Sequence, residues 1–253
     1  MTATRIEFQA VARALQSPHP VSHYGYRALE SRDQSLSVLL IQSGIGPEKA
    51  RKGTQQLLDG ASWDVIISTG FAGALDVVPI GSVLIGHEVL SESLTTSSTP
   101  ATSHPVVCHP DWVKMALGMN WIGQESLRSG RFVSVGHVLT HSVDKHQLRA
   151  CTGAMAVDME SAAIGEMAQG HGRPFLIVRV ISDGVNEDLP VDFNLFLRPS
   201  GWVPGVLHIM TTPRSWKGFL DLYRHSKQAS QQLTRFFKEF FSALSIMSMP
   251  PTP

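Results

Sequence analysis

The sequence FLIVRVISDG, from Phe175 to Gly184, is the strongest single indication of the fold class. Residues 175–181 are the clearest buried strand in the chain, and Ser182-Asp183-Gly184 ends it. On both sides of this strand, short apolar runs alternate with amphipathic stretches along the chain. That alternation is typical of strands alternating with helices around a largely parallel sheet.

The same pattern places the other elements. It predicts strands at residues 38–42, 64–69, 80–90, 131–139 and 154–158, and helices at residues 6–15, 47–58, 142–150, 159–170 and 215–247. The segments 91–105 and 185–214 are expected to form loops, the second with one short helix at most. The chain starts almost directly on its first helix, so the first strand is expected to be short or missing. The sequence therefore predicts one α/β domain over residues 1–247, a mixed but mostly parallel central sheet flanked by helices, and a disordered tail over residues 248–253.

Composition narrows the class of partner. Hydrophobic residues make up 43% of the chain, and 21 basic residues balance 21 acidic ones. A nucleic-acid-binding protein normally carries a basic surplus, so a small molecule is the expected partner. Cys108 and Cys151 lie far apart and are expected to be free thiols in a reducing compartment. No apolar run has membrane-spanning length and no signal peptide is visible, which favours a cytoplasmic enzyme.

The last helix carries an aromatic stripe that includes Phe236, Phe237, Phe240 and Phe241. Packing against the sheet or a second subunit is the favoured interpretation of the stripe, and contact with lipid stays open as an alternative.

Candidate functional residues follow three predicted strands. Gly70-Phe71-Ala72-Gly73, Asp158-Met159-Glu160-Ser161 and Ser182-Asp183-Gly184 each come where a strand ends. Open parallel sheets bind ligands at these carboxyl ends, although each feature alone is an ordinary turn or helix cap. Gly44-Ile45-Gly46 lacks the third glycine of a dinucleotide-binding loop. His137 and His141 lack a third ligand, so no metal site is expected.

Four blocks in order carry a family resemblance. They are SGIG at residues 43–46, IISTGFAGALD at 66–76, AVDMESAAI at 156–164 and VRVISDGVNE at 178–187. With these blocks the chain resembles the nucleoside phosphorylase and nucleosidase superfamily (the purine and uridine phosphorylase family) over nearly its whole length. It is most similar to the methylthioadenosine and adenosylhomocysteine nucleosidase branch. Its C-terminal part, with LP at 189–190 and RPSG at 198–201, resembles the hopanoid-associated phosphorylases, which are thought to act on adenosylhopane.

The resemblance implies roles for the acidic residues. The family breaks the bond between base and ribose dissociatively, with positive charge growing on the sugar and negative charge on the base. Asp183 matches the acid that donates to N7 of a purine, and Glu160 matches the carboxylate that accepts hydrogen bonds from the 2′ and 3′ hydroxyls. Glu7 matches the glutamate that activates water in the nucleosidases. A helix or turn cap is the alternative for Asp183, and an exposed acid in a first helical turn is the alternative for Glu7.

The resemblance also implies the walls of the substrate site. Met159 is expected against the face of the sugar. The base pocket is expected to be lined by Phe71 and by the backbone around Gly73, Leu139 and Ile181, and Ser182 is expected among the substrate-binding residues. A place in the core is the alternative for Phe71.

Water is the favoured nucleophile. Phosphorolysis needs cationic groups, and the hexameric phosphorylases carry arginines where this chain has Glu7 and Ser68, although Arg5 lies close enough to rebuild part of a phosphate site. The expected reaction is hydrolysis of a purine nucleoside of the adenosyl type. Phosphorolysis, on adenosylhopane or a related nucleoside, and non-catalytic nucleoside binding are the alternatives.

No cofactor is expected beyond phosphate as a co-substrate in the phosphorolytic case. Relatives are dimers or hexamers, so a homo-oligomer is expected, while membrane association stays open.

Overall fold

The computed structural model describes residues 1–33, 35–92, 104–119, 121, 127–189 and 213–247, with the side chains of 213–219 and 247 left out. The predicted loops at 91–105 and 185–214 and the predicted tail at 248–253 lie largely or wholly outside these residues. The elements are α1 (Arg5–Ala12), β1 (His19–His23), β2 (Tyr26–Arg32), β3 (Ser37–Gln42), α2 (Pro47–Gly60), β4 (Ile66–Ala74), β5 (Val83–Ser91), β6 (Val106–Val107), α3 (Pro110–Leu117), β7 (Leu127–Ser134), α4 (Ser142–Thr152), β8 (Ala156–Asp158), α5 (Ser161–Gly170), β9 (Phe175–Asp183) and α8 (Pro213–Met247).

The central sheet is mixed and closes on itself. Its strand order is β6-β5-β7-β8-β4-β9, and β5 also pairs with β9. The two longest registers, β4 with β9 and β5 with β7, are parallel, whereas β4–β8, β5–β6 and β5–β9 are antiparallel. The sequence pattern pointed to an open sheet. The sheet closes into a ring instead, because β5 and β9 are both long apolar strands and pair along Val83–Gly86. As a result, the ends of β4, β8 and β9 lie around one side of a compact sheet.

The first residues act as the short strand that the sequence left in doubt. Thr2 pairs with Gln42 of β3 in a parallel bridge, and Met1 exchanges backbone hydrogen bonds with Ile67 and Thr69 of β4. They connect the central sheet to a second sheet of order β1-β2-β3. This placement fixes Thr4 and α1 beside the end of β4.

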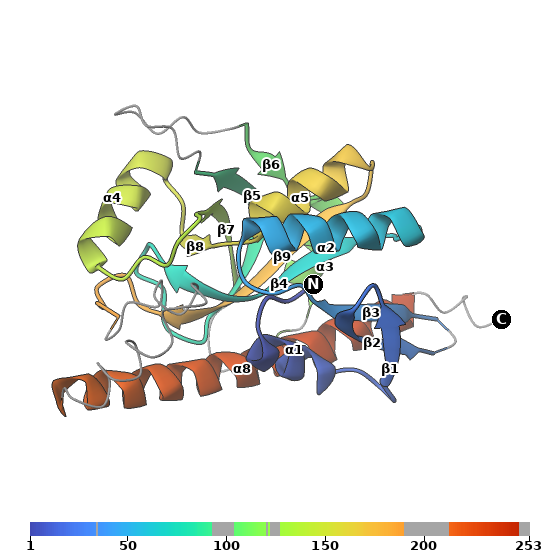
Figure 1. Cartoon of the computed structure of the whole chain (residues 1–253), viewed down its shortest axis with the longest axis horizontal. Helices are drawn as coiled ribbons and strands as arrows, with labels where there is room; N and C mark the ends of the chain where they lie inside the picture. The colour runs from blue at the N-terminus through green and yellow to red at the C-terminus, as the bar shows by residue number, and fades with distance from the viewer. Residues whose placement is uncertain (34, 93–103, 120, 122–126, 190–212, 248–253) are drawn as a thin grey trace.

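Helices cover the central sheet on two sides (Figure 1). α2 and α5 contact each other on one side, and α1 and α8 contact each other on the opposite side. Apolar side chains fill both interfaces. α5 can approach the sheet closely because it carries Ala162, Ala163 and Gly165, all buried. The helices therefore hold the strand ends rigidly, as an active site requires.

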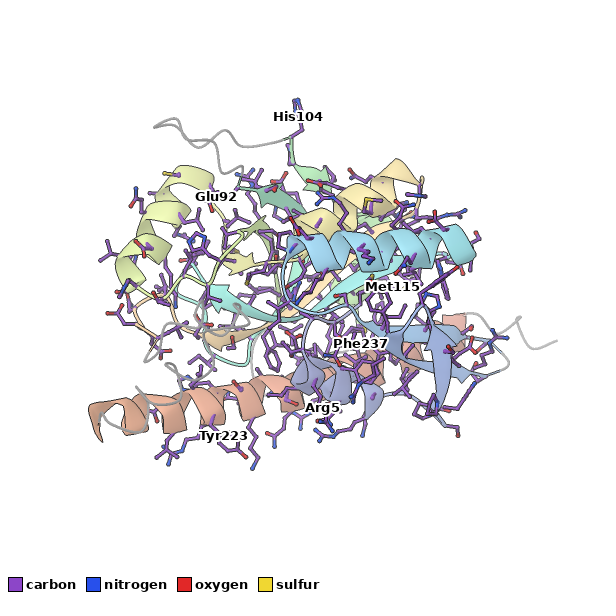
Figure 2. All side chains as sticks on the ribbon, viewed as in Figure 1. Arg5, Glu92, His104, Met115, Tyr223 and Phe237 are labelled. Carbon is purple, nitrogen blue, oxygen red and sulfur yellow. The ribbon has the colours of Figure 1, made fainter. Side chains whose placement is uncertain are left out.

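The aromatic stripe of α8 packs inward. Phe237 lies on the side of α8 that faces the molecule, while Tyr223 lies on its outer side (Figure 2). Phe236, Phe237 and Phe240 are at most 2% exposed and contact one another edge-on or stacked. Packing within the chain therefore explains these three rings. Among the described helices, none combines the length and the apolarity needed to cross a bilayer.

Two segments that the sequence pattern assigned to no helix or strand contain regular structure. Residues 19–32 form the hairpin of β1 and β2, whose turn residues Tyr24 and Gly25 have φ of 46° and 79°. Such turns usually carry Asn-Gly or Asp-Gly, so Tyr-Gly gives little signal. Residues 110–117 form α3, which begins at Pro110 and buries only Ala116.

Candidate active site

A cavity of about 200 Å³ lies where β4, β8 and β9 end. It is lined by residues of the predicted blocks together with the first turn of α1 and the segment before α4. Of the predicted site residues, it brings together Glu7, Phe71, Gly73, Leu139, Met159, Glu160, Ser182 and Asp183. Ile181 is not among the lining residues; its side chain is fully buried in the core behind the cavity. His137 also lines the cavity, and His141 forms the N-cap of α4.

Arg179 forms the floor beneath the acidic residues. It projects from β9, is 1% exposed, and its Nη2 lies 2.9 Å from Asp158 Oδ2 and 3.5 Å from Glu160 Oε2. The same nitrogen donates to Ser68 Oγ and Ser161 Oγ. Burial lowers the pKa of Arg179, but the carboxylates around it raise the pKa by more. The guanidinium therefore stays charged and compensates the acids above it.

Asp158 holds the start of α5 in place. Its Oδ1 accepts hydrogen bonds from the backbone N–H groups of Glu160 and Ser161 and from Ser134 Oγ, and its Oδ2 accepts from Ser161 Oγ. These bonds satisfy N–H groups that a helix start leaves unpaired. They fix the backbone of Glu160, whose side chain then points at the cavity.

Glu160 is a buried carboxyl with unused acceptor capacity. Its Oε1 accepts from the backbone N–H of Gly46, which has a φ of 101° that favours glycine and starts α2. Burial raises the pKa of Glu160 to about 7, against the opposing charge of Arg179 and with a further rise from Asp158 and Glu7. A carboxylate has about four lone-pair sites, so two further donors such as vicinal hydroxyls can bind.

Glu7 is held by backbone N–H groups. Its Oε2 accepts from Ala3 at 3.1 Å and Thr4 at 2.7 Å, and its Oε1 accepts from Phe71 of β4 at 2.8 Å. The bond to Thr4 belongs to a capping box at the start of α1. A Cβ on Gly70 would collide with Glu7 Oε1 and Arg179 Nη1, so the glycine leaves the space that both side chains use. Glu7 is 4% exposed, so it differs from the exposed acid of the alternative interpretation.

Asp183 ends β9 and is paired with a lysine. Lys145 Nζ donates to Asp183 Oδ2 at 2.6 Å, and Ser182 Oγ donates to Asp183 Oδ1 at 2.9 Å. Lys145 comes from α4 and is completely buried, although it contributes to the cavity lining. Four carboxyl groups thus line the cavity, and those of Glu7, Glu160 and Asp183 are the candidates for catalysis, because Asp158 already accepts four hydrogen bonds.

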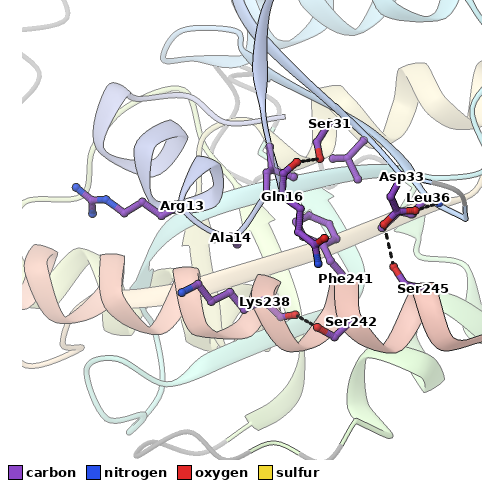
Figure 3. Close-up of a pocket in the computed structure, with 12 residues that line it drawn as sticks. Arg13, Ala14, Gln16, Ser31, Asp33, Leu36, Lys238, Phe241, Ser242 and Ser245 are labelled. Carbon is purple, nitrogen blue, oxygen red and sulfur yellow. Dashed lines mark hydrogen bonds between the residues drawn. The ribbon is translucent and has the colours of Figure 1, made fainter.

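A second cavity, of about 320 Å³, lies between the end of α1, β2 and α8 (Figure 3). Its hydroxyl groups are used locally: Ser31 Oγ donates to Gln16 O, and Ser245 Oγ donates to Asp33 Oδ2. Its charged groups Arg13 and Lys238 are exposed. No buried acid faces this cavity within the described residues, so we assign the chemistry to the cavity at the strand ends.

Comparison with known proteins identifies the family. The model of the phosphorylase superfamily matches residues 1–198. The chain belongs to the phosphorylase superfamily. It is an enzyme of this superfamily.

Relatives of this superfamily enzyme include two 5′-methylthioadenosine/S-adenosylhomocysteine nucleosidases. The one from Chromohalobacter salexigens is 26% identical over 201 residues, which cover 76% of this chain and 86% of the relative. The one from Staphylococcus epidermidis is 29% identical over 169 residues, which cover 63% of this chain and 74% of the relative.

Solved structures share the fold of the superfamily enzyme. The nucleosidase of that type from Neisseria meningitidis, in complex with methylthio-immucillin-A, has a TM-score of 0.69 at 20% identity, covering 94% of this chain and 96% of the other. The futalosine hydrolase of Helicobacter pylori has a TM-score of 0.75 at 16% identity, covering 95% of both chains. At these identities the likeness shows the fold, in agreement with the predicted α/β architecture.

Two residues at the site, Arg179 and Lys145, were not predicted from the sequence. Arg179 interrupts an otherwise apolar strand, and that interruption was a signal that could have found it. Lys145 lies among polar residues on an amphipathic helix, where a lysine is normally a solvated side chain, so no sequence pattern marks it as a site residue.

Proposed function

We propose that the protein hydrolyses the N-glycosidic bond of a purine nucleoside of the adenosyl type and releases adenine. One observation carries the proposal: Glu160, Met159 and Asp183, which lie in the family blocks, line one cavity together with Glu7 of α1. The named activities of the two sequence relatives support the substrate class.

Each carboxyl has a role that its contacts support. Asp183 donates a proton to N7 of the departing base. Glu160 accepts hydrogen bonds from the 2′ and 3′ hydroxyls with the acceptor capacity that Gly46 and Arg179 leave over. Its negative charge lies near the cation that forms on the ribose. Met159 packs on the sugar face, where a thioether does not compete for hydrogen bonds.

Glu7 activates the water. Three of its roughly four lone-pair sites accept backbone N–H groups, which leaves about one for a water molecule. The rigid backbone contacts orient that site, as a positioned base requires.

Charge at the cavity supports water over phosphate as the nucleophile. Among the described lining residues, Lys145 is the only lysine or arginine, and it is paired with Asp183. Arg5 is exposed and does not line the cavity in the described part of the chain. A phosphate site needs cations that are free to bind it.

The test is adenine release from 5′-methylthioadenosine, followed by liquid chromatography with and without phosphate. The wild type is expected to release adenine without phosphate, and both Asp183→Asn and Glu7→Gln are expected to lower kcat by about 100-fold or more. Glu48→Gln, which changes an exposed acid in the first turn of α2, is the matched control and should retain the wild-type rate. Release that depends on phosphate would replace the proposal by phosphorolysis. If the protein cleaves adenosylhopane and leaves 5′-methylthioadenosine intact, the proposed substrate becomes a nucleoside with a bulky 5′ group.

A further inference from the structure

Lys145 is the one lysine of the described chain with no exposed surface at all. Its Nζ donates to Asp183 Oδ2 at 2.6 Å, to the carbonyl of Gly184 at 2.8 Å and to the carbonyl of Glu187 at 3.2 Å. All three donor hydrogens of the ammonium are therefore used. Removing a charge from water costs several kcal/mol, so a lysine held in this way needs a specific reason.

The contacts of Asp183 pose a problem for an acid. Oδ2 accepts from Lys145 Nζ, and Oδ1 lies 2.9 Å from Ser182 Oγ, whose one hydrogen is shared between this oxygen and the carbonyl of Ala72. In this pair Lys145 is the donor and Asp183 the acceptor, so the hydrogen between Nζ and Oδ2 is carried by the ammonium. An ionised carboxylate has no proton to give to a departing base. The transferable proton at this place belongs to Lys145.

The position of Oδ2 allows the proton to continue into the cavity. A Cβ on Gly73 would lie 2.9 Å from Asp183 Oδ2, so the absence of a side chain at Gly73 leaves this oxygen uncovered. Gly73 lines the cavity, as do Asp183 and Lys145. A base lying along Gly73 can therefore approach the oxygen that already shares a hydrogen with Lys145.

We propose that Lys145 and Asp183 act together as the acid, with Lys145 supplying the proton that Asp183 hands to N7; this inference rests on the proposed function. As the C1′–N9 bond breaks, its electron pair moves to the base. A proton moves from Nζ to Oδ2 and from Oδ2 to N7, which leaves Lys145 as a neutral amine and Asp183 ionised. The attacking water gives its proton to Glu7. After the products leave, Glu7 releases this proton to solvent and Lys145 takes one up from solvent, which restores the starting state. Lys145 acts through Asp183 and is a positioning residue that also stores the proton.

Other charged groups near Asp183 are already engaged. Glu187 Oε2 accepts from the backbone N–H of Gly184 and lies 3.8 Å from His225 Nδ1 on α8. Asp188 Oδ1 accepts from the backbone N–H of Ser142. Arg179 contacts Asp158 and Glu160 instead. In the described part of the chain, Lys145 is thus the cation in contact with Asp183.

A simpler role for Lys145 would be structural, since its bonds tie α4 to the segment after β9. The two roles differ for leaving groups that need no proton. Adenine leaves as a basic anion that must be protonated, whereas 4-nitrophenolate is a stable anion. Comparing 5′-methylthioadenosine with 4-nitrophenyl 5-methylthio-β-D-ribofuranoside therefore isolates proton supply from folding and sugar binding.

Two variants of the full-length protein test the proposal. Lys145→Met removes charge and donors, and Lys145→Gln keeps N–H donors for Asp183 and the carbonyls but carries no transferable proton. Lys52→Met, an exposed change on α2, is the control. We expect both Lys145 variants to lower kcat on 5′-methylthioadenosine by about 100-fold relative to their kcat on the nitrophenyl riboside, the size of a general-acid effect.

Each possible result either supports or overturns the proposed role of Lys145. Wild-type kcat on 5′-methylthioadenosine in Lys145→Gln would overturn the proposal, and so would an equal loss on both substrates, which would assign Lys145 a structural role. A wild type that releases no adenine would overturn the proposed function and this inference together. An active wild type with unaffected Lys145 variants would overturn the inference alone.

Discussion

Glu160→Gln is expected to remove a large part of the pH dependence of stability between pH 5 and pH 8. Burial raises the pKa of Glu160 from 4.5 to about 7 in the folded protein. Between these two values the folded protein keeps a proton that the unfolded chain has lost, so the free energy of unfolding falls as pH rises through this window. The difference of roughly 2.5 pKa units, at about 1.4 kcal/mol each, amounts to about 3 kcal/mol. Glutamine resembles the protonated acid at every pH.

The assay is urea unfolding at pH 5 and at pH 8 for the wild type and the variant. Other titrating groups contribute equally to both proteins, so they cancel when the two pH differences are subtracted. The wild type should lose about 3 kcal/mol more than Glu160→Gln on going from pH 5 to pH 8. Glu48→Gln, at an exposed site, should behave as the wild type. Equal losses in wild type and Glu160→Gln would show that the Arg179 guanidinium fully compensates the buried carboxylate. They would contradict the raised pKa of Glu160.

Two further changes probe the support of the site. Arg179→Met should lower the free energy of unfolding by about 3–5 kcal/mol, because it leaves buried carboxylates without their cation; a loss below about 1 kcal/mol in urea unfolding, the usual value of an exposed ion pair, would contradict this account. Gly165→Ala should cost about 1–3 kcal/mol because its Cβ would lie 2.6 Å from both Phe175 and Val106. Gly170→Ala on the same helix meets nothing within 4 Å and should cost nothing, so similar losses in the two alanine variants would contradict close packing as the cause.

The fold was predictable where local pattern and burial agree. Residues 175–181 are apolar except for Arg179, and they lie in β9, which pairs with β4 and β5 and is buried on both faces. The hairpin of β1 and β2 was not predictable, because its strands are largely exposed or half-buried and so lack an apolar alternation. The ring closure was not predictable either, since it depends on pairing between β5 and β9, which lie far apart in the sequence.

The site was predictable where a residue type matches a family block, and not where its partner comes from another element. Glu160 and Asp183 follow strands within recognisable blocks, and both line the cavity. Their charge partners depend on tertiary contacts: Lys145 reaches Asp183 from a helix 38 residues earlier. Ile181 was expected to line the base pocket through its backbone; its side chain is buried in the core, and its neighbours Ser182 and Asp183 line the cavity.

The most direct test of the central claim is the identity of the sugar product when wild-type protein cleaves 5′-methylthioadenosine in phosphate buffer. Phosphorus NMR distinguishes a free sugar from a sugar 1-phosphate, and liquid chromatography confirms adenine in the same sample. We expect adenine together with free 5-methylthioribose and no new phosphate ester. Accumulation of 5-methylthioribose 1-phosphate at the rate of adenine release would contradict it, because it would show that phosphate takes the place assigned to the water held by Glu7.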